Sequence, residues 1–205
     1  MLETGITPDF ITVDGAEGGT GAAPIEFTNS MGTPLRDGLI FVHNALIGTG
    51  LRSSIRIIAS GKALSAFHLL RLLALGADTV NMARGMMFSL GCIQSRHCNE
   101  DTCPTGVTTQ DPARYKALDV NLKADRVANY HAATIENLKE LIAAAGLKNP
   151  EELRPWYINR RVGGTDVKNY AELYPCVTDE CLLSEINMPE AWRSDWAQAT
   201  SNSWQ

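Results

Sequence analysis

Three of the five cysteines in the chain lie close together in one polar stretch. Cys92, Cys98 and Cys103 are separated by five and then four residues, and Pro104 follows the third. Thiolates are soft ligands that suit iron–sulfur clusters and zinc, and closely spaced cysteines without a secretory signal are typical of metal or redox sites. Structural zinc sites use shorter cysteine pairs and a fourth ligand, so the spacing favours an iron–sulfur cluster with three protein ligands. A zinc site and ordinary free thiols are the alternatives.

Three loops with glycines form the second set of candidates. The first contains Gly18, Gly19, Thr20 and Gly21, where the absence of a Cβ lets the backbone approach a flat ligand closely. The other two contain Ser60, Gly61 and Lys62, and Ala83, Arg84 and Gly85. Backbone N–H groups at a following helix start can hold a phosphate, with added charge from a lysine or arginine. Turn geometry and solvated surface charge are the structural alternatives for these residues.

The elements around these loops alternate between strand and helix. Strands are expected at residues 8–14, 55–60 and 78–83, where β-branched and aromatic residues gather. Helices are expected at residues 34–46 and 63–75, and Gly76 stops the second. A strand, a helix and a strand in succession form a βαβ unit with parallel, buried strands. The pattern therefore predicts an α/β fold in which each candidate loop follows a strand.

Two motifs in this order resemble the flavin domain of glutamate synthases. Residues 14–24 are DGAEGGTGAAP, and residues 102–112 are TCPTGVTTQDP. Residues 8–112 and 193–200 are similar to the shorter FMN-binding glutamate synthase-related proteins. The resemblance implies a TIM-type (β/α)8 barrel that carries FMN and, in the full enzymes, a 3Fe-4S cluster.

The resemblance also implies roles for the candidate residues. Cys92, Cys98 and Cys103 would ligate the cluster, and residues 18–21 would lie near the isoalloxazine ring. In a parallel barrel the loops after strands seven and eight bind phosphate, and here these would be residues 60–62 and 83–85. Asp14 at the first strand tip is expected to cap its loop through backbone N–H groups rather than to be catalytic.

The length of the chain limits how much of a barrel it can form. A (β/α)8 barrel needs about 250 residues, whereas this chain has 205. The three β/α units resemble the last three of eight, so residues 1–112 are expected to form that part of the barrel. Residues 113–205 are expected to be a mostly helical extension packed on it, with a helix at 123–145 ended by Gly146. Asn149 and Pro150 are expected to open a further short helix.

The family implies an oxidoreductase of glutamate biosynthesis. In it, FMN takes electrons from the cluster and reduces 2-iminoglutarate, formed from 2-oxoglutarate and ammonia, to L-glutamate. The substrate would be of the 2-oxoglutarate and glutamate class, the electron donor is open, and this chain alone is expected to be inactive. The alternatives are a non-catalytic fragment that forms homo-oligomers through unpaired strand edges and a small thiolate zinc-binding protein.

Composition bears on partners and location. The net charge is −5, 44% of the residues are hydrophobic, and no apolar run is long enough to span a bilayer. An acidic chain without a basic stripe argues against nucleic acid, and the N-terminal residues lack the pattern of a signal peptide. A cytoplasmic protein is therefore expected. Packing or surface roles are expected for His43, His68 and His131, free thiols for Cys176 and Cys181, and a packing pair for Trp192 and Trp196, which lie one helical turn apart.

Overall fold

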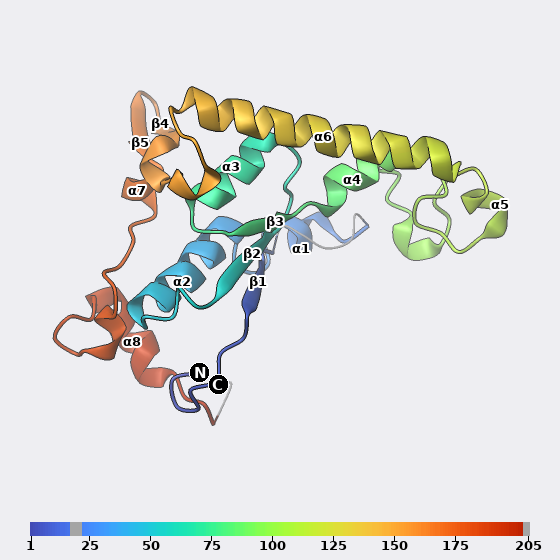
Figure 1. The fold of residues 1–205 in the computed structure, drawn as a ribbon. Helices are drawn as coiled ribbons and strands as arrows, with labels where there is room; N and C mark the ends of the chain where they lie inside the picture. Colours follow the sequence, from blue (N-terminus) through green and yellow to red (C-terminus); the bar gives the residue numbers. More distant parts are fainter. Residues whose placement is uncertain (17–21, 203–205) are drawn as a thin grey trace.

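Three parallel strands lie at the centre of the molecule (Figure 1), in a computed structural model that describes residues 1–16 and 22–202. They are β1 (Phe10–Asp14), β2 (Arg56–Ser60) and β3 (Thr79–Asn81). The strands pair in chain order, β1 with β2 and β2 with β3. Because all three run parallel, their carboxyl ends meet at one edge of the sheet, where Asp14 is in register with Ser60 and Ser60 with Asn81. The three predicted strands are confirmed, although β3 ends at Asn81, two residues before the predicted end, and Ala83 belongs to the helix that follows.

Helices alternate with these strands. A short helix, α1 (Ile25–Asn29), and then α2 (Leu35–Gly48) connect β1 to β2, α3 (Ala66–Ala74) connects β2 to β3, and α4 (Ala83–Leu90) follows β3. The side chain of Ser65 caps α3 by accepting the backbone N–H of His68. Gly76 lies just beyond the end of α3 at φ +101°. A backbone with positive φ ends the helix, and glycine adopts it at little cost because it has no Cβ. The predicted alternation of strand and helix is confirmed.

One face of the sheet is covered by helices. Ile57 and Ala59 of β2 and Leu39 of α2 are fully buried, and they belong to one hydrophobic core. Helix α2 contacts β1 and β2, and α3 contacts β3. On β1 the burial alternates, so that Thr12 on the other face is exposed. Within the described residues the sheet is therefore half covered and has two open edges.

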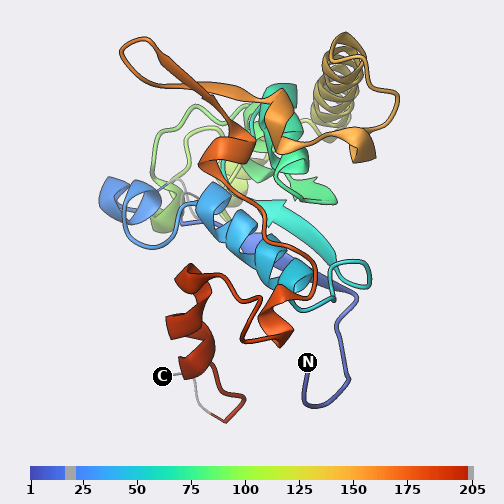
Figure 2. The ribbon, with the colours of Figure 1, turned by 90° about the vertical axis from the view of Figure 1, so that its left-hand side faces the viewer.

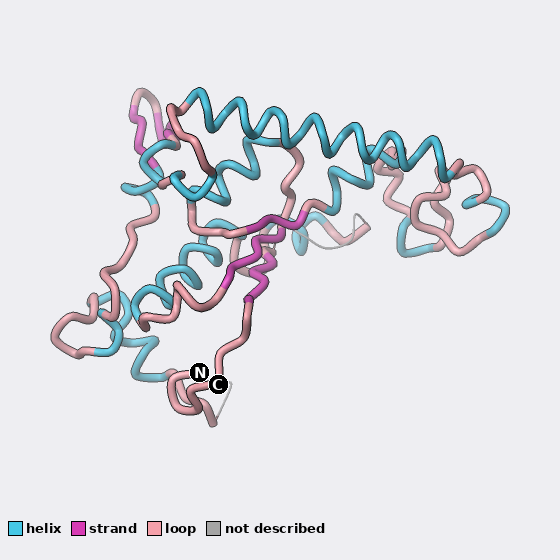
Figure 3. Tube along the Cα trace, in the orientation of Figure 1, coloured by secondary structure: helices cyan, strands magenta, loops and turns pink. Residues whose placement is uncertain are grey.

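A long helix, α6 (Val120–Ala144), crosses α3 and α4 (Figures 1 and 3) and contacts both. Tyr130 Oη donates to the carbonyl oxygen of Leu64 at 2.7 Å. A Cβ at Gly85 would lie 2.6 Å from Tyr130 Oη, so α4 can approach α6 this closely only with glycine there. The predicted helix at 123–145 is confirmed, with Gly146 at φ +77° just beyond its end. Across residues 1–16 and 22–202, no helix is both long and apolar enough to cross a membrane.

The extension after residue 112 contains a hairpin that the expectation of a mostly helical segment did not include. Strands β4 (Asn159–Gly163) and β5 (Asp166–Asn169) pair antiparallel. Helix α7 (Tyr170–Leu173) follows the hairpin and contacts β5, whereas α5 (Pro112–Tyr115) precedes α6 and α8 (Glu190–Gln198) lies near the C-terminus. The short helix after Asn149 is a single 3-10 turn, Pro150–Glu152, and the Asn149 side chain donates to Glu152 instead of capping it. Asn149 therefore takes the predicted N-cap position without a side-chain cap hydrogen bond, and Pro150 opens the turn as predicted.

The C-terminal segment returns to α2 (Figure 2). Cys181 and Leu182 are buried there with Met188, and both Trp192 and Trp196 pack against this cluster. The ring of Trp192 stacks on Phe41 of α2, with 4.8 Å between ring centres. The tryptophans thus have a packing role, as predicted, but the stacking partner of Trp192 is a distant residue in sequence.

Candidate functional site

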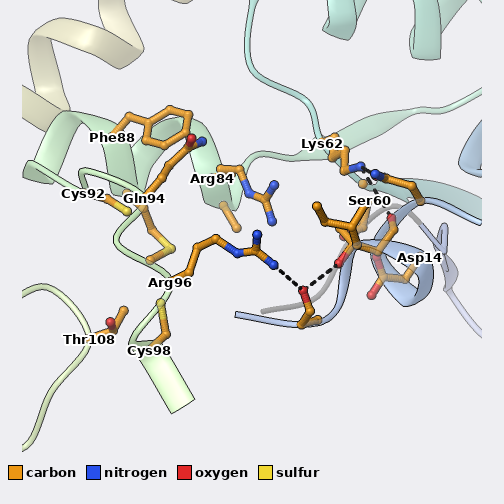
Figure 4. Close-up of a pocket in the computed structure, with 17 residues that line it drawn as sticks. Asp14, Ser60, Lys62, Arg84, Phe88, Cys92, Gln94, Arg96, Cys98 and Thr108 are labelled. Carbon is orange, nitrogen blue, oxygen red and sulfur yellow. Dashed lines mark hydrogen bonds between the residues drawn. The ribbon is translucent and has the colours of Figure 1, made fainter. Parts of the chain in front are cut away.

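A pocket of about 680 Å³ opens at the carboxyl ends of the strands (Figure 4). Asp14 and Ser60 at the ends of β1 and β2 form one wall, together with residues of α1. The start of α4 and the cysteine loop that follows α4 form the rest. Parallel α/β folds commonly bind ligands in this position, so the location agrees with the sequence-based prediction.

Both loops predicted to hold phosphate reach this pocket. Ser60, Gly61, Lys62, Ala83 and Arg84 all line it. Gly61 (φ +149°) and Lys62 (φ +45°) form a tight turn, and the Lys62 ammonium donates to Asn29 Oδ1 and to the carbonyl oxygen of Thr28. The Arg84 side chain extends into the pocket from the first turn of α4 (Figure 4). The first N–H groups of a helix have no intrahelical acceptor, so this wall offers donors as well as charge.

Gly85 and residues 18–21 are the other positions predicted to bind a cofactor. Gly85 is buried and its missing side chain faces Tyr130, so packing alone explains the glycine. Gly18, Gly19, Thr20 and Gly21 lie outside the described residues, and their predicted role is untested. Asp14 lines the pocket. The loop whose backbone N–H groups Asp14 was expected to cap includes residues 17–21, which lie outside the described residues, so this prediction is also untested.

The cysteine loop forms the wall opposite the strand ends. Helix α4 ends at Gly91, which is left-handed at φ +108°, and the chain then enters the loop. Cys92 and Cys98 line the pocket, whereas Cys103 is only 4% exposed. All three are free thiols, as are Cys176 and Cys181. Within the described ranges, no three His, Cys, Asp or Glu side chains converge as ligands of one metal ion.

The surroundings of Cys103 favour a thiolate. Burial alone would raise the pKa of this thiol, but interactions with the side chains and backbone N–H groups of Thr105 and Thr108 lower the pKa to about 6. Cys103 Sγ lies 3.5 Å from Thr105 Oγ1. Thr108 Oγ1 lies near the sulfur but has no hydrogen bond of good geometry within the described chain, although it is buried.

These observations fit sulfur ligation. A buried hydroxyl without a partner costs free energy, and Thr108 lines the pocket beside Cys98 (Figure 4). An acceptor such as a thiolate or an inorganic sulfide at this position would satisfy it. The thiolates of an iron–sulfur cluster bind separate iron atoms, so the three sulfurs need not converge on one point.

Sequence reasoning missed several residues of the pocket. Gln94 and Arg96 line it, and both have left-handed backbones, at φ +57° and +64°. Such conformations cost side-chain-bearing residues about 1 kcal/mol or more. Arg96 Nη2 donates to the carbonyl oxygen of Ala23 at 3.4 Å and so links the cysteine loop to the segment after β1. The sequence signal that could have identified Arg96 was its position between Cys92 and Cys98. Its contact with Ala23, which is distant in sequence, left no signal in the sequence.

Other side chains near the site have structural partners. His97, beside Cys98, pairs with Glu100, with 2.8 Å between Nδ1 and Oε2. Met87 and Phe88 of α4 line the pocket and supply its apolar part. The pocket thus combines the thiols of the cysteine loop and the apolar side chains of α4 with basic groups from both walls, namely Lys62 beside the strand ends and Arg84 and Arg96 from α4 and the cysteine loop.

The fold and pocket define a mixed α/β protein with a ligand pocket at the carboxyl edge of a parallel sheet. The chain belongs to the glutamate synthase family, because residues 3–148 match the model described as the conserved region in glutamate synthase. The family resemblance seen in the sequence is therefore confirmed.

Relatives agree with this membership. The chain is similar to the glutamate synthase large subunit-like protein YerD of Bacillus subtilis, with 50% identity over 150 residues, 73% of this chain and 29% of that protein. It is similar to the archaeal glutamate synthase (NADPH) of Methanocaldococcus jannaschii, with 40% identity over 146 residues, 71% of this chain and 29% of that protein. The match to the glutamate synthase (NADPH) large chain of Bacillus subtilis has 33% identity over 166 residues, 81% of this chain and 10% of that protein. The chain thus spans less than a third of each of these relatives.

Proposed function

We propose that this chain is the part of an FMN- and iron–sulfur-dependent glutamate synthase-like oxidoreductase that holds the FMN phosphate and the cluster. The observation that carries the proposal is that one pocket contains both the phosphate-type loops and two of the three clustered cysteines. In the proposed arrangement, β1, β2 and β3 are the last three strands of a TIM-type barrel. The names of the relatives support an oxidoreductase of glutamate biosynthesis.

The loops after β2 and β3 would bind the phosphate of FMN. Backbone N–H groups at the start of α4 would donate to the phosphate oxygens, and Arg84 and Lys62 would add positive charge. Gly61, at φ +149°, lets the chain turn after β2 toward the pocket, and an added Cβ there would lie 3.2 Å from Leu35 Cδ2. The apolar side chains of Met87 and Phe88 would exclude water from the ring system.

The cysteine loop would bind the cluster. Cys92, Cys98 and Cys103 supply the three thiolates, and Thr105 and Thr108 supply donors near the sulfur of Cys103. Hydrogen bonds to cluster sulfurs change the reduction potential, so these threonines would tune it. When bound, FMN supplies two-electron transfer to the substrate and the cluster supplies one-electron transfer to the flavin.

The substrate would be a small molecule of the 2-oxoglutarate and glutamate class, with reduction of 2-iminoglutarate to L-glutamate as the reaction. Since the chain spans only 29% of relatives such as YerD, we propose that other segments supply the substrate contacts. The chain alone would then show no turnover. The proposed location is the cytoplasm, and the electron donor is a separate question.

Iron binding tests the cluster. After anaerobic reconstitution with iron and sulfide, we expect about three iron atoms per chain and brown visible absorption. Cys98→Ser should remove the absorption, because a serine hydroxyl does not ionise near neutral pH and is a poor replacement for a thiolate. Cys176→Ser, which changes an exposed thiol outside the pocket, should retain it. Iron-free protein would contradict the proposal, and a colourless protein that retains zinc would support the thiolate zinc alternative.

An FMN titration followed by flavin fluorescence tests the second cofactor. Arg84→Gln should weaken FMN binding about tenfold, because it removes one charge-assisted contact to phosphate. Arg160→Gln is the matched control, since Arg160 lies on the exposed hairpin strand β4. Equal affinities for the two variants would show that Arg84 does not contact the phosphate.

A further inference from the structure

A second, smaller pocket of about 130 Å³ lies between the start of α2 and α3. Four of its lining residues carry basic side chains, namely Arg36, Lys62, His68 and Arg71. His68 and Arg71 are three positions apart on α3, so they share one face of the helix. Basic residues from α2, from the turn after β2 and from α3 therefore meet at one small cavity.

The two arginines are short of acceptors. Arg36 Nη1 donates to Tyr170 Oη at 3.2 Å, and Arg71 lies 5.2 Å from the centre of the Phe67 ring. Arg71 Nε is buried and has no hydrogen-bond partner in the described part of the chain. The ion pairs found among residues 1–16 and 22–202 include neither arginine. A buried guanidinium N–H without an acceptor is costly, so this position calls for an acceptor.

The pKa of His68 is affected by its burial and by the two arginines of the pocket. Burial and then the charges of Arg71 and Arg36 lower its pKa. Ser65 Oγ accepts the backbone N–H of His68 and lies 2.9 Å from His68 Nδ1. A serine hydroxyl that donates to Nδ1 leaves the ring proton on Nε2, where it is available as a further donor.

Lys62 contributes less than its position suggests. Its ammonium group contacts Asn29 and Thr28, which line the larger pocket, so mainly its stem and backbone border the small one. The acidic neighbour Asp37 is exposed and acts electrostatically on Arg36. The strong donors of the small pocket are therefore Arg36, Arg71 and His68.

We propose that this pocket binds a small oxyanion of phosphate size, held by Arg36, His68 and Arg71. Oxygen atoms of a tetrahedral anion would accept from both guanidinium groups and satisfy Arg71 Nε. The volume of about 130 Å³ admits a phosphate group but not a nucleotide. The site adjoins the larger pocket through Gly61 and Lys62, which line both, but its proposed donors Arg36, His68 and Arg71 do not line the larger pocket. It therefore does not depend on the proposed function.

Calorimetric titration with inorganic phosphate tests the site. The titration is made in a zwitterionic buffer with chloride at fixed ionic strength, on the whole chain carrying Arg84→Gln so that the larger pocket is weakened. Arg71→Met, which keeps the apolar stem, should lower phosphate affinity at least tenfold on this background. Arg126→Met on the exposed face of α6 should leave it unchanged. A thermal melt of each variant shows whether it is folded.

Nuclear magnetic resonance gives a second readout that does not need a variant. Addition of phosphate should shift the ring signals of His68 and not those of exposed His131. A phosphate monoester with a bulky group tests the source of the anion. An affinity equal to that of inorganic phosphate indicates a phosphate carried by a larger molecule, and no binding of the monoester indicates the free ion. Both outcomes support the site. An unchanged His68 signal, or phosphate binding that is lost on saturation with FMN, would overturn the proposal.

Discussion

At the residue scale, one arginine connects several elements of the fold. The Arg52 side chain is 20% exposed, and all its donor nitrogens have acceptors. The acceptors are His43 Nδ1 at 3.0 Å, Ile55 O at 3.0 Å, Gly76 O at 2.9 Å and Asp78 Oδ2 at 2.8 Å. Arg52 therefore links α2, the start of β2 and the turn that leads into β3.

Replacement of Arg52 should be much more harmful than replacement of a neighbour that contacts the same carboxylate. We expect Arg52→Met to lower the free energy of unfolding by about 3 kcal/mol, because it removes a half-buried charge partner of Asp78 and the side-chain donor of two carbonyl groups, Ile55 O and Gly76 O. Arg56 Nη1 lies 3.2 Å from Asp78 Oδ1, but its side chain is 70% exposed. Arg56→Met should therefore cost less than about 1 kcal/mol. Urea unfolding measures both, and equal losses would contradict this account.

His43 should make stability depend on pH. Burial first, and then the charge of Arg52, lowers its pKa to about 4 from the ordinary 6.5. Between these values the unfolded chain binds a proton that the folded chain does not, so stability is full above pH 6.5 and falls as the pH decreases toward 4. The loss due to this residue is about 3 kcal/mol.

The pH dependence can be assigned to His43 by comparing two variants. In His43→Gln the free energy of unfolding should fall less steeply between pH 6.5 and 4 than in the unchanged chain. In His131→Gln, which alters an exposed residue, the slope should not change. Urea unfolding at several pH values gives these slopes, and a slope that is unchanged in His43→Gln would show that folding does not lower the pKa of His43.

At the element scale, α2 contains two glycines that are predicted to respond in opposite ways to alanine. A Cβ at Gly38 would lie 3.6 Å from Thr33 Cγ2, an ordinary contact. A Cβ at Gly48 would lie 2.5 Å from Leu182 Cγ, where the C-terminal segment packs on the helix. Gly38→Ala should therefore stabilise the protein by up to about 1 kcal/mol through helix propensity, whereas Gly48→Ala should destabilise it by about 1–3 kcal/mol through overpacking. Thermal unfolding of both variants checks the signs.

The elements that the sequence predicted are those with a periodic pattern and a clear end. Residues 63–75 repeat apolar side chains at helical spacing before Gly76, and the structure has α3 there. The hairpin was not predicted, because every residue of β4 is exposed and its sequence, NRRVG, has no apolar alternation. The paired Gly163 and Gly164 were the visible sign of a turn.

The candidate site was predicted in part for a similar reason. Short motifs identified Cys92, Cys98 and the loops at Ser60 and Ala83, because each motif contains all its residues within a few positions. Arg96 and the anion-type pocket were not predicted, because their partners come from other elements. Arg36 and Arg71 are on different helices, and only the packing of α2 beside α3 brings them to one cavity. Tertiary proximity of this kind leaves no periodic signal in a single sequence.

At the scale of the whole molecule, the central sheet leaves apolar surface exposed. Among the described residues, β1 pairs only with β2, so its other edge presents N–H and C=O groups without strand partners. Phe10 on β1 is 55% exposed, and Phe27 of α1 is 62% exposed. Open strand edges and apolar faces favour association with another chain or another segment of the same protein.

We therefore expect this chain to form dimers or larger oligomers when it is studied alone. Phe10→Lys should shift the population toward monomer, because a charge at the edge strand must be desolvated in any contact made there. Val167→Lys is the matched control, since Val167 lies on the separate hairpin and is 54% exposed. Size-exclusion chromatography with light scattering at several concentrations measures the mass. If both variants dissociate equally, the β1 edge is not the specific contact. If the unchanged chain is monomeric at all concentrations, the expectation is wrong and the exposed sheet face is stable in water without a partner.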